Sequence, residues 1–232
     1  MWDGKNKAVT FSFDDGVKQD IRAIGILNKY GLKATFNLNS GYLGNVGKSD
    51  YNGKTIVRDK VRPCDVKPVY AGHEVAVHTL SHPNLTMLDE ESIVYQVEKD
   101  REILSELCGY EVVGMAYPCG GVNNDDRVAE IIKRRTGVKF SRTITSTYNF
   151  DLQDNLYRFD PSVYYAHYDE MISLAEEFIS LKTDKPQLLY IWGHTYELDY
   201  GDKIDWERFE ALCRLISGKS GIFYGTNKEV LL

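Results

Sequence analysis

Short apolar runs alternate with amphipathic segments along most of the chain. The runs are rich in β-branched and aromatic residues, as buried strands are, and the segments between them space apolar residues three or four apart, as helices do. This alternation predicts an α/β fold built on parallel strands. The predicted strands are residues 8–13, 33–38, 73–78, 112–117, 138–140, 188–192 and 221–225. The predicted helices are residues 17–30, 89–107, 124–135, 168–181 and 205–216.

Two carboxylates follow the first predicted strand. Asp14 and Asp15 are adjacent, and Gly16 comes next. Neighbouring side chains of an extended chain point to opposite faces, so the two carboxylates have different tasks, and their mutual repulsion favours a cation between them. An Asp-Asp-Gly sequence is also a common helix cap and turn, and this pair alone leaves both interpretations open.

Two histidines follow a later strand. His78 and His82 lie in the sequence His-Thr-Leu-Ser-His-Pro. Histidines four apart lie on one face of a helical turn, which is a common way to present two imidazoles to one metal. This pair after one strand, and two carboxylates after another, predict a metal site.

Four segments carry a resemblance to a known family. They are residues 10–16, 78–83, 117–120 and 189–194, in that order along most of the chain. With these motifs the chain resembles the polysaccharide deacetylase family, also called the NodB-homology domain or carbohydrate esterase family 4. The first two motifs together are specific, whereas the other two would be weak alone.

The resemblance implies roles for individual residues. Asp15, His78 and His82 would hold one divalent metal ion, usually Zn2+, with Co2+, Ni2+ and Mn2+ as alternatives. Asp14 would be the general base, His194 the general acid, and the backbone amide of Cys119 a donor to the oxyanion. An Asp, two His and open positions for water and substrate also agree with metal-assisted hydrolysis.

Two departures from the family pattern concern the partners of these residues. The family often has an arginine two residues before Pro118 that pairs with the catalytic carboxylate, and this chain has Ala116 there. We hypothesise that Arg142, after the strand at 138–140, replaces it; the alternative is an ordinary surface arginine. The aspartate and tryptophan motif of the family, which supports the general acid, is not recognisable at 145–165.

Three residues near these motifs are candidate substrate contacts. Tyr117 lies in the third motif. Leu189 and Trp192 lie on the last apolar strand before His194, and their positions could bring an apolar side chain against a small acyl group. Glu197 and Asp199 follow closely, and they either orient the imidazole of His194, contact substrate or are solvated loop acids.

Every candidate reactive residue lies at or just after the carboxyl end of a predicted strand, which is the layout of a (β/α) barrel. At 232 residues we expect a distorted, incomplete, seven-stranded, TIM-barrel-like barrel, as the resemblance also implies. An open doubly wound sheet is the alternative, but sites on early, middle and late strands converge more easily in a ring. We expect one domain, residues 1–232, with an irregular insertion at about 41–70 that shapes specificity.

The predicted function is a metal-dependent hydrolase that removes an acetyl group from an N-acetylated amino sugar, oligosaccharide or polysaccharide. Hydrolysis of an O-acetyl ester, or of a small non-sugar amide or imide, would use the same groups and stays open. A non-catalytic carbohydrate-binding protein is a third alternative. The loss of arginine at Ala116 favours it, and the presence of all the reactive residues disfavours it.

Net charge, apolar runs and cysteine spacing limit the possible binding partners of the protein and its cellular compartment. A net charge of −6 argues against nucleic acid and anionic membranes. No apolar run reaches the roughly 18–20 residues of a membrane span. The first residues lack the apolar stretch of a signal peptide, so the sequence as it stands is expected to be cytoplasmic, or secreted or in the cell envelope if a leader was removed. The four cysteines include no Cys-x-x-Cys pair, which indicates free thiols.

Overall fold

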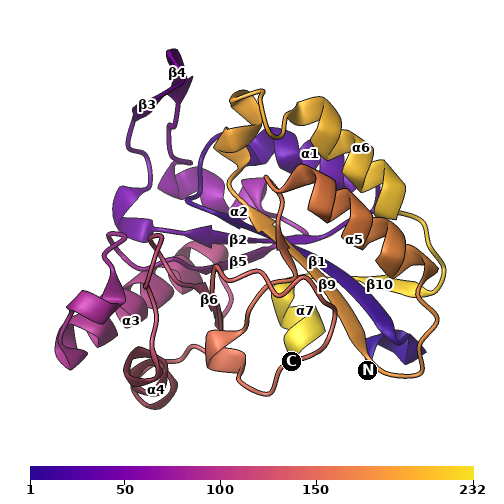
Figure 1. The fold of residues 1–232 in the computed structure, drawn as a ribbon. Helices are drawn as coiled ribbons and strands as arrows, with labels where there is room; N and C mark the ends of the chain where they lie inside the picture. Colours follow the sequence, from indigo (N-terminus) through magenta and orange to yellow (C-terminus); the bar gives the residue numbers. More distant parts are fainter.

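A curled parallel sheet forms the centre of the protein, which the computed structural model describes over residues 1–232 (Figure 1). The strands are β1 (Lys7–Asp14), β2 (Ala34–Leu38), β5 (Glu74–Val77), β6 (Gly114–Ala116), β7 (Phe140–Arg142), β8 (Val163–Tyr164), β9 (Gln187–Gly193) and β10 (Ile222–Tyr224). Along the sheet their order is β7, β6, β5, β2, β1, β9, β8, and β10 pairs with β1. All of these pairings are parallel.

The central strand β1 is buried along nearly its whole length. It pairs with β9 over most of its residues, with β2 at its carboxyl end and with β10 at its amino end. Phe11 and Phe13 of this strand pack against the ring of Phe209, and Phe13 also packs against Phe36. Strands buried on both faces are continuous apolar runs, which explains why this strand was recognisable from the sequence.

The two edge strands, β7 and β8, approach each other and nearly close a ring. Phe159, just before β8, donates its backbone N–H to Ser141 of β7 at 3.0 Å, and Thr143 donates back to Phe159 at 2.9 Å. Ser162 then donates to Tyr190 of β9 at 2.9 Å. This seam is an isolated bridge rather than a ladder. The prediction of a distorted, incomplete (β/α) barrel is therefore confirmed.

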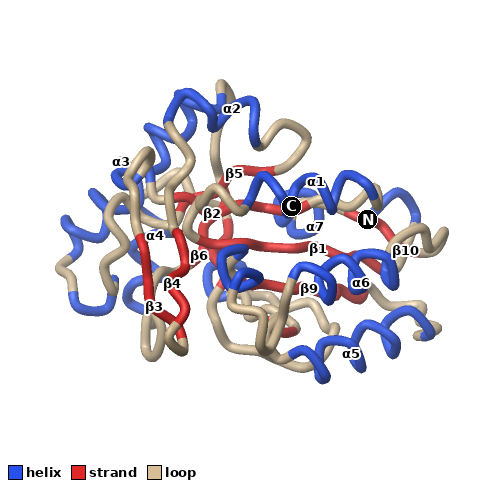
Figure 2. The backbone as a smooth tube through the Cα atoms, turned by 90° about the horizontal axis from the view of Figure 1, so that it is seen from above, coloured by secondary structure: helices blue, strands red, loops and turns tan.

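Helices lie on both sides of the strands (Figure 2), close to the predicted ranges. Three of them begin at aspartate caps that accept backbone hydrogen bonds, Asp89, Asp125 and Asp205. No helix combines the length and the apolar character needed to cross a bilayer. The long helices are α1 (Asp20–Lys29), α3 (Glu90–Cys108), α4 (Asp126–Arg135), α5 (Tyr168–Ser180) and α6 (Trp206–Ile216).

Several short elements were not predicted. The α-helices are α2 (Val66–Val69) and α7 (Asn227–Leu231), and the antiparallel hairpin is β3 (Lys48–Tyr51) and β4 (Lys54–Val57). The 3-10 turns are η1 (Trp2–Gly4), η2 (Ser40–Tyr42), η3 (Pro63–Asp65), η4 (Leu85–Met87), η5 (Leu156–Arg158) and η6 (Thr195–Asp199).

The segment at 41–70, predicted to be an irregular insertion, therefore contains regular elements, namely the hairpin, η3 and α2, separated by loops. Its hairpin is docked against η6 and the residues that follow it. Tyr51 stacks on Tyr200 with ring centroids 3.9 Å apart, and its hydroxyl donates to Asp202 at 2.6 Å. Lys54 donates to a backbone carbonyl of η6 at 2.5 Å. These contacts hold the hairpin near the carboxyl ends of the central strands.

A buried polar cluster lies at the opposite end of the barrel, where α7 closes it. Glu74 accepts hydrogen bonds from the Thr35 hydroxyl at 2.7 Å and from the backbone N–H of Lys228 at 2.9 Å. Asn227 accepts from the Thr10 hydroxyl at 2.9 Å and donates its backbone N–H to Thr35 at 2.8 Å. Burial raises the pKa of Glu74 to about 7.

We expect Glu74 to make the stability of the fold depend on pH. Its pKa of about 7 in the folded protein exceeds the ordinary glutamate value of 4.5, so between these values the folded state binds more protons than the unfolded chain. Raising the pH across this window therefore lowers the free energy of unfolding, by at most about 1.4 kcal/mol per pH unit.

Urea denaturation of the wild type and of Glu74→Gln at several pH values measures this effect. The wild type should lose roughly 2–3 kcal/mol of unfolding free energy relative to the variant between about pH 4.5 and about pH 7.5. Other titrating groups contribute to both proteins and cancel in the difference. A difference that stays constant with pH would contradict the raised pKa.

Candidate active site

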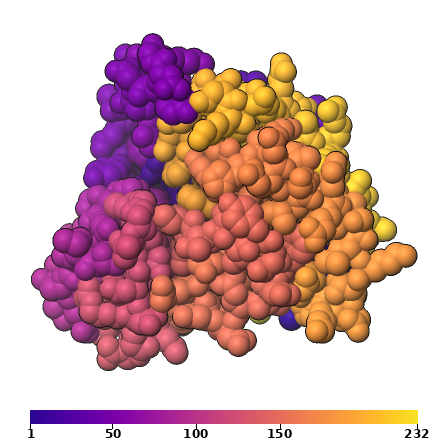
Figure 3. All heavy atoms as spheres, in the orientation of Figure 1, coloured from indigo at the N-terminus to yellow at the C-terminus, as the bar shows by residue number.

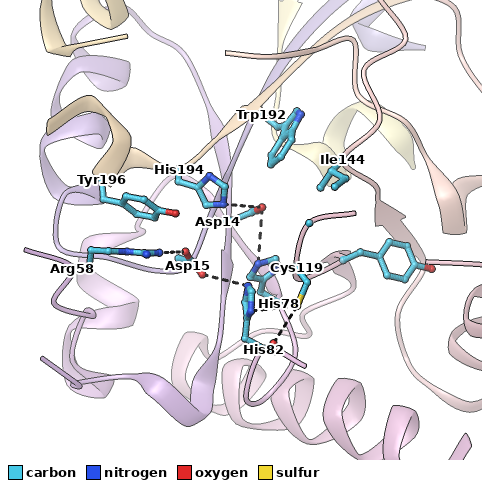
Figure 4. A pocket seen from close by; sticks show the side chains of 12 residues that line it. Asp14, Asp15, Arg58, His78, His82, Cys119, Ile144, Trp192, His194 and Tyr196 are labelled. Atoms are coloured by element: carbon cyan, nitrogen blue, oxygen red, sulfur yellow. Dashed lines mark hydrogen bonds and ion pairs between the residues drawn. The ribbon is translucent and has the colours of Figure 1, made fainter. Parts of the chain in front are cut away.

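A cavity of about 220 Å³ opens at the carboxyl ends of the central strands. The surface is hollowed there, between the purple residues around the hairpin and the orange segments (Figure 3). Its wall combines the ends of β1, β5, β6 and β9 with nearby loops, as expected for a (β/α) barrel (Figure 4). The lining residues are Asp14, Asp15, Arg58, His78, His82, Tyr117, Cys119, Gly120, Ile144, Trp192, His194 and Tyr196.

Asp15, His78 and His82 converge, as the motifs predicted. Each offers one ligand atom, and these atoms lie within 4.8 Å of one another. The Nδ1 of His78 lies 2.9 Å from the carbonyl oxygen of Ala116, so Nδ1 donates a hydrogen bond and Nε2 is left as the acceptor. Burial lowers the pKa of His78 to about 4, which keeps the ring neutral. One carboxylate and two imidazoles fit a zinc-like divalent ion.

The histidines do not lie on a helical turn, although the sequence suggested one. They lie in a loop after β5, with ring centroids 4.9 Å apart and planes inclined by 70°. Thr79 and His82 have φ of 68° and 58°, and Asp15 and Cys119 have φ of 83° and 71°. Left-handed backbone is costly for residues with a Cβ. Four such residues at one site indicate that the surrounding structure holds these loops in place.

Asp14 is paired with Arg142 inside the barrel. The Nη2 of Arg142 lies 2.5 and 2.6 Å from the two carboxylate oxygens, and both side chains are buried. Arg142 also lies over the ring of Trp192, 4.5 Å from its centroid, and donates from Nη1 to the Thr143 carbonyl at 2.9 Å. The interpretation of Arg142 as a surface arginine is wrong. Its effect on catalysis stays a prediction.

The pairing with Arg142 sets the charge of Asp14. Burial by itself would raise the pKa of this carboxyl, but the positive charge of Arg142 and its hydrogen bonds outweigh burial and lower the pKa below its usual value. The carboxylate is therefore ionised at neutral pH.

Asn37 is a second partner of Asp14, and the sequence analysis missed it. Its Nδ2 donates to Oδ1 of Asp14 at 2.8 Å and to the hydroxyl of Ser12 at 2.8 Å. The available signal was a polar residue near the end of the apolar strand Ala-Thr-Phe-Asn-Leu. The Oδ2 of Asp14 is turned toward the cavity, 4.0 Å from Nε2 of His78 and 4.0 Å from Nε2 of His194.

His194 is held by Glu197. The Nδ1 of His194 lies 3.3 Å from Oε1 of Glu197, and the other carboxylate oxygen is 3.3 Å from the backbone nitrogen of His194. Tyr164 donates to Glu197, and Tyr165 donates to the carbonyl of His194. Burial would lower the pKa of His194, but the charges of Glu197 and the neighbouring aspartates raise it to about 9. Of the three interpretations of Glu197, the structure supports the one in which it orients His194.

Cys119 and Tyr117 lie where the third motif predicted, in the cavity wall. The backbone N–H of Cys119 makes no hydrogen bond within the protein. Its Sγ lies 3.8 Å from Nδ1 of His82. Tyr117 is almost fully buried, and its hydroxyl donates to the carbonyl of Tyr157 at 2.8 Å. The amide of Cys119 is thus available to a ligand, whereas the hydroxyl of Tyr117 is already engaged.

Of the two predicted contacts on β9, the structure places Trp192 in the cavity wall and Leu189 outside it. Leu189 is fully buried in the hydrophobic core and pairs with Val9 in the first half of β1. The cavity begins further along the strand, at the level of Trp192. The expectation that Leu189 contacts substrate does not agree with this placement.

Two cations from the segment after the hairpin reach Asp15. The Nη2 of Arg58 donates to Oδ2 of Asp15 at 2.9 Å, and Lys60 donates to its backbone carbonyl at 2.6 Å. Burial would raise the pKa of Asp15, but the charges of His194 and Lys60, among others, hold it well below its usual range. No local sequence signal identified these residues. The cavity residues that the sequence analysis missed are Arg58, Ile144 and Tyr196.

A curled parallel barrel with an Asp-His-His cluster at its mouth, and a further carboxylate and histidine beside it, has the residues of a metal-assisted hydrolase. The sequence model of one such family, described as polysaccharide deacetylase, matches residues 3–139, more than half of the chain. The chain belongs to the polysaccharide deacetylase family.

Individual relatives agree with this assignment. The peptidoglycan-N-acetylglucosamine deacetylase of Listeria monocytogenes is 27% identical over 129 residues, which are 55% of this chain and 24% of that protein. The peptidoglycan-N-acetylmuramic acid deacetylase of Bacillus subtilis is 28% identical over 127 residues, 54% and 24% of the two proteins. The chain thus matches about a quarter of the length of these relatives.

A solved structure shows the same fold. The family 4 carbohydrate esterase from Streptomyces lividans, in complex with acetate, superposes with a TM-score of 0.58 over 96% of this chain and 93% of that chain, at 17% identity.

We expect the protein to bind one divalent ion at Asp15, His78 and His82. Replacing His82 by alanine removes one of three donors, so the affinity for Zn2+ should fall by roughly 100-fold or more in competition with a chromogenic chelator. His167→Ala is the matched control, because His167 is exposed and lies outside the cluster. Equal affinities in the wild type and both variants would contradict the assignment.

We expect Arg142→Met to destabilise the fold, because it leaves the buried Asp14 carboxylate without its cation. The free energy of unfolding in urea at neutral pH should fall by about 3–5 kcal/mol. Arg158→Met is the control, because the ion pair of Arg158 with Asp126 is solvent-exposed and should contribute less than about 1 kcal/mol. Similar losses of unfolding free energy in the two variants would contradict the expectation that the buried ion pair of Arg142 stabilises the fold more than an exposed pair.

Proposed function

We propose that the chain is a metal-dependent deacetylase that releases acetate from an N-acetylated amino sugar in an oligosaccharide or polysaccharide. One observation carries the proposal: Oδ2 of Asp14 lies 4.0 Å from Nε2 of both His78 and His194, which brings a base and an acid to one edge of the ligand cluster. Family membership and the printed names of the two relatives, which refer to amino sugars of peptidoglycan, support the same bond.

A divalent cation held by Asp15, His78 and His82 would act as a Lewis acid toward the acetyl carbonyl and the attacking water. Zn2+ is the first choice for a site of two imidazoles and one carboxylate, and Co2+, Ni2+ and Mn2+ are alternatives.

Asp14 and His194 divide the proton transfers. The lowered pKa of Asp14 keeps it ionised to accept a proton from water, and Arg142 and Asn37 fix its orientation. The raised pKa of His194 favours the protonated ring, which donates to the leaving amine, and Glu197 fixes the plane of the ring. Opposite shifts of two neighbouring groups let one act as base and the other as acid at the same pH.

The remaining cavity residues would bind the acetyl group. The free backbone N–H of Cys119 is a donor for the developing oxyanion. Trp192 and Ile144 supply apolar wall for the methyl group. A cavity of about 220 Å³ is small, so it would hold the acetamido group and little more than its own sugar ring, with the rest of a glycan outside.

Three alternative functions receive different support from the structure. An O-acetyl ester or a small amide or imide would meet the same residues, and only substrate tests separate them. The structure gives less support to a non-catalytic carbohydrate-binding protein than the sequence does. In the sequence Asp14 lacks a cation at Ala116, whereas in the structure Arg142 pairs with Asp14. If the substrate is peptidoglycan, as for the two relatives, the protein acts at the cell envelope.

Acetate release from N-acetylated and O-acetylated saccharides, with and without dipicolinate, tests the proposal. We expect chelator-sensitive release from an N-acetylated sugar. Asp14→Asn and His194→Ala should each lower kcat by roughly 10²- to 10⁴-fold, because each removes a proton-transfer group. His167→Ala, an exposed histidine outside the cavity, should stay within about twofold of the wild type.

The outcomes separate the alternatives. Release from esters alone would name an esterase. Metal binding without acetate from any saccharide would contradict the proposed function, as would full activity in Asp14→Asn.

A further inference from the structure

We infer that the substrate carries an anionic group, a carboxylate or a phosphate, near its acetamido group, and that Arg58 binds this anion. The inference rests on the proposed function, because it describes a feature of that substrate. Arg58 directly follows the hairpin β3–β4, and its side chain lies in the cavity wall, where it points toward Asp15 (Figure 4).

The guanidinium of Arg58 is held in place but has unused donors. Its central carbon lies 3.7 Å from the centroid of the Tyr196 ring, so the aromatic face supports it. Within the protein the side chain donates only from Nη2, to Oδ2 of Asp15 at 2.9 Å. The side chain is 30% exposed. An arginine fixed in this way can bind a carboxylate or a phosphate with two parallel hydrogen bonds.

The carboxylates around Arg58 do not need its remaining donors. Asp15 has a second cation, since Nζ of Lys60 lies 3.6 Å from its Oδ1. The other carboxylates at the site have cations of their own: Asp14 pairs with Arg142, and Glu197 with His194. An oxyanion of the substrate is therefore the partner that Arg58 still lacks.

Substitution of Lys60 distinguishes binding of a substrate anion by Arg58 from a simpler role, in which Arg58 only holds Asp15. An arginine that served only to hold Asp15 would affect neutral and anionic substrates alike. Lys60 contacts the same aspartate but does not line the cavity. Substitution of Lys60 thus reports the effect of disturbing Asp15 without removing a group that faces the substrate.

The test compares kcat/KM for acetate release from three saccharides of equal length, a neutral N-acetylglucosamine oligomer, one containing N-acetylmuramic acid, and one bearing a phosphate. For each anionic saccharide, kcat/KM is divided by the kcat/KM of the neutral saccharide. Arg58→Gln should lower this ratio by roughly 10- to 100-fold for the saccharide with the carboxylate or for the one with the phosphate. Lys60→Met should change this ratio by less than about threefold. Effects through Asp15 act on all three substrates and cancel in the ratio.

The anionic saccharide whose kcat/KM falls relative to the neutral saccharide in Arg58→Gln identifies the anion that Arg58 binds. A ratio that Arg58→Gln leaves unchanged, or that Lys60→Met lowers equally, overturns the inference. If Arg58→Gln does not fold, the wild type decides: rising ionic strength should weaken its preference for an anionic substrate, and a wild type without such a preference overturns the inference.

Failure of the proposed function would be recognised separately. If no saccharide releases acetate, the proposed function fails, and dissociation constants of the same three compounds, measured by calorimetry, replace the rates. Anion-dependent binding that is lost in Arg58→Gln and kept in Lys60→Met would still support the inference. Equal binding of neutral and anionic saccharides would overturn it.

Discussion

The ion pair between Asp14 and Arg142 is the contact on which the site depends, because it forms only if the sheet curls. Asp14 ends β1 and Arg142 ends β7, four strands away in the order of the sheet. Strands lie about 4.8 Å apart, so in a flat sheet the two residues would be separated by roughly 19 Å, well beyond the reach of an arginine side chain. The observed separations of 2.5 and 2.6 Å therefore require that the sheet curls. An open doubly wound sheet could not make this contact.

Local patterns in the sequence predicted most elements and the centre of the site. Most of the parallel strands are largely apolar runs, and a polar residue that follows such a strand lies at the mouth of the barrel. This is why Asp15, His78 and His194 could be expected to meet. The hairpin β3–β4 also had a local signal, because Asn52 and Gly53 form its two-residue turn with φ of 50° and 78°. Its strands are largely exposed and lack apolar alternation, so we predicted an irregular segment instead.

Contacts between distant segments could not be predicted in the same way. Arg58 reaches Asp15 because the hairpin is docked through the stack of Tyr51 on Tyr200, and nothing in the local sequence specifies the partner of a half-exposed tyrosine. Leu189 illustrates a different limit. Alternation along a strand indicates which face a side chain takes, but not how far along the strand the cavity begins. That depth is set by the register of β9 on β1, which only the assembled sheet determines.

Arg142 gives Asp14 a buried cation from the strand next to the one that ends at Ala116. Ala116 and Arg142 are paired in register on the neighbouring strands β6 and β7, so both lie at the same level of the barrel mouth. An arginine shifted by one strand moves about 4.8 Å, and its long side chain still reaches Asp14. The carbonyl of Ala116 accepts from Nδ1 of His78 at 2.9 Å, a main-chain contact that any residue can make. In this structure Asp14 therefore has a cation at its own level of the barrel mouth, beside a carboxylate that burial would otherwise neutralise.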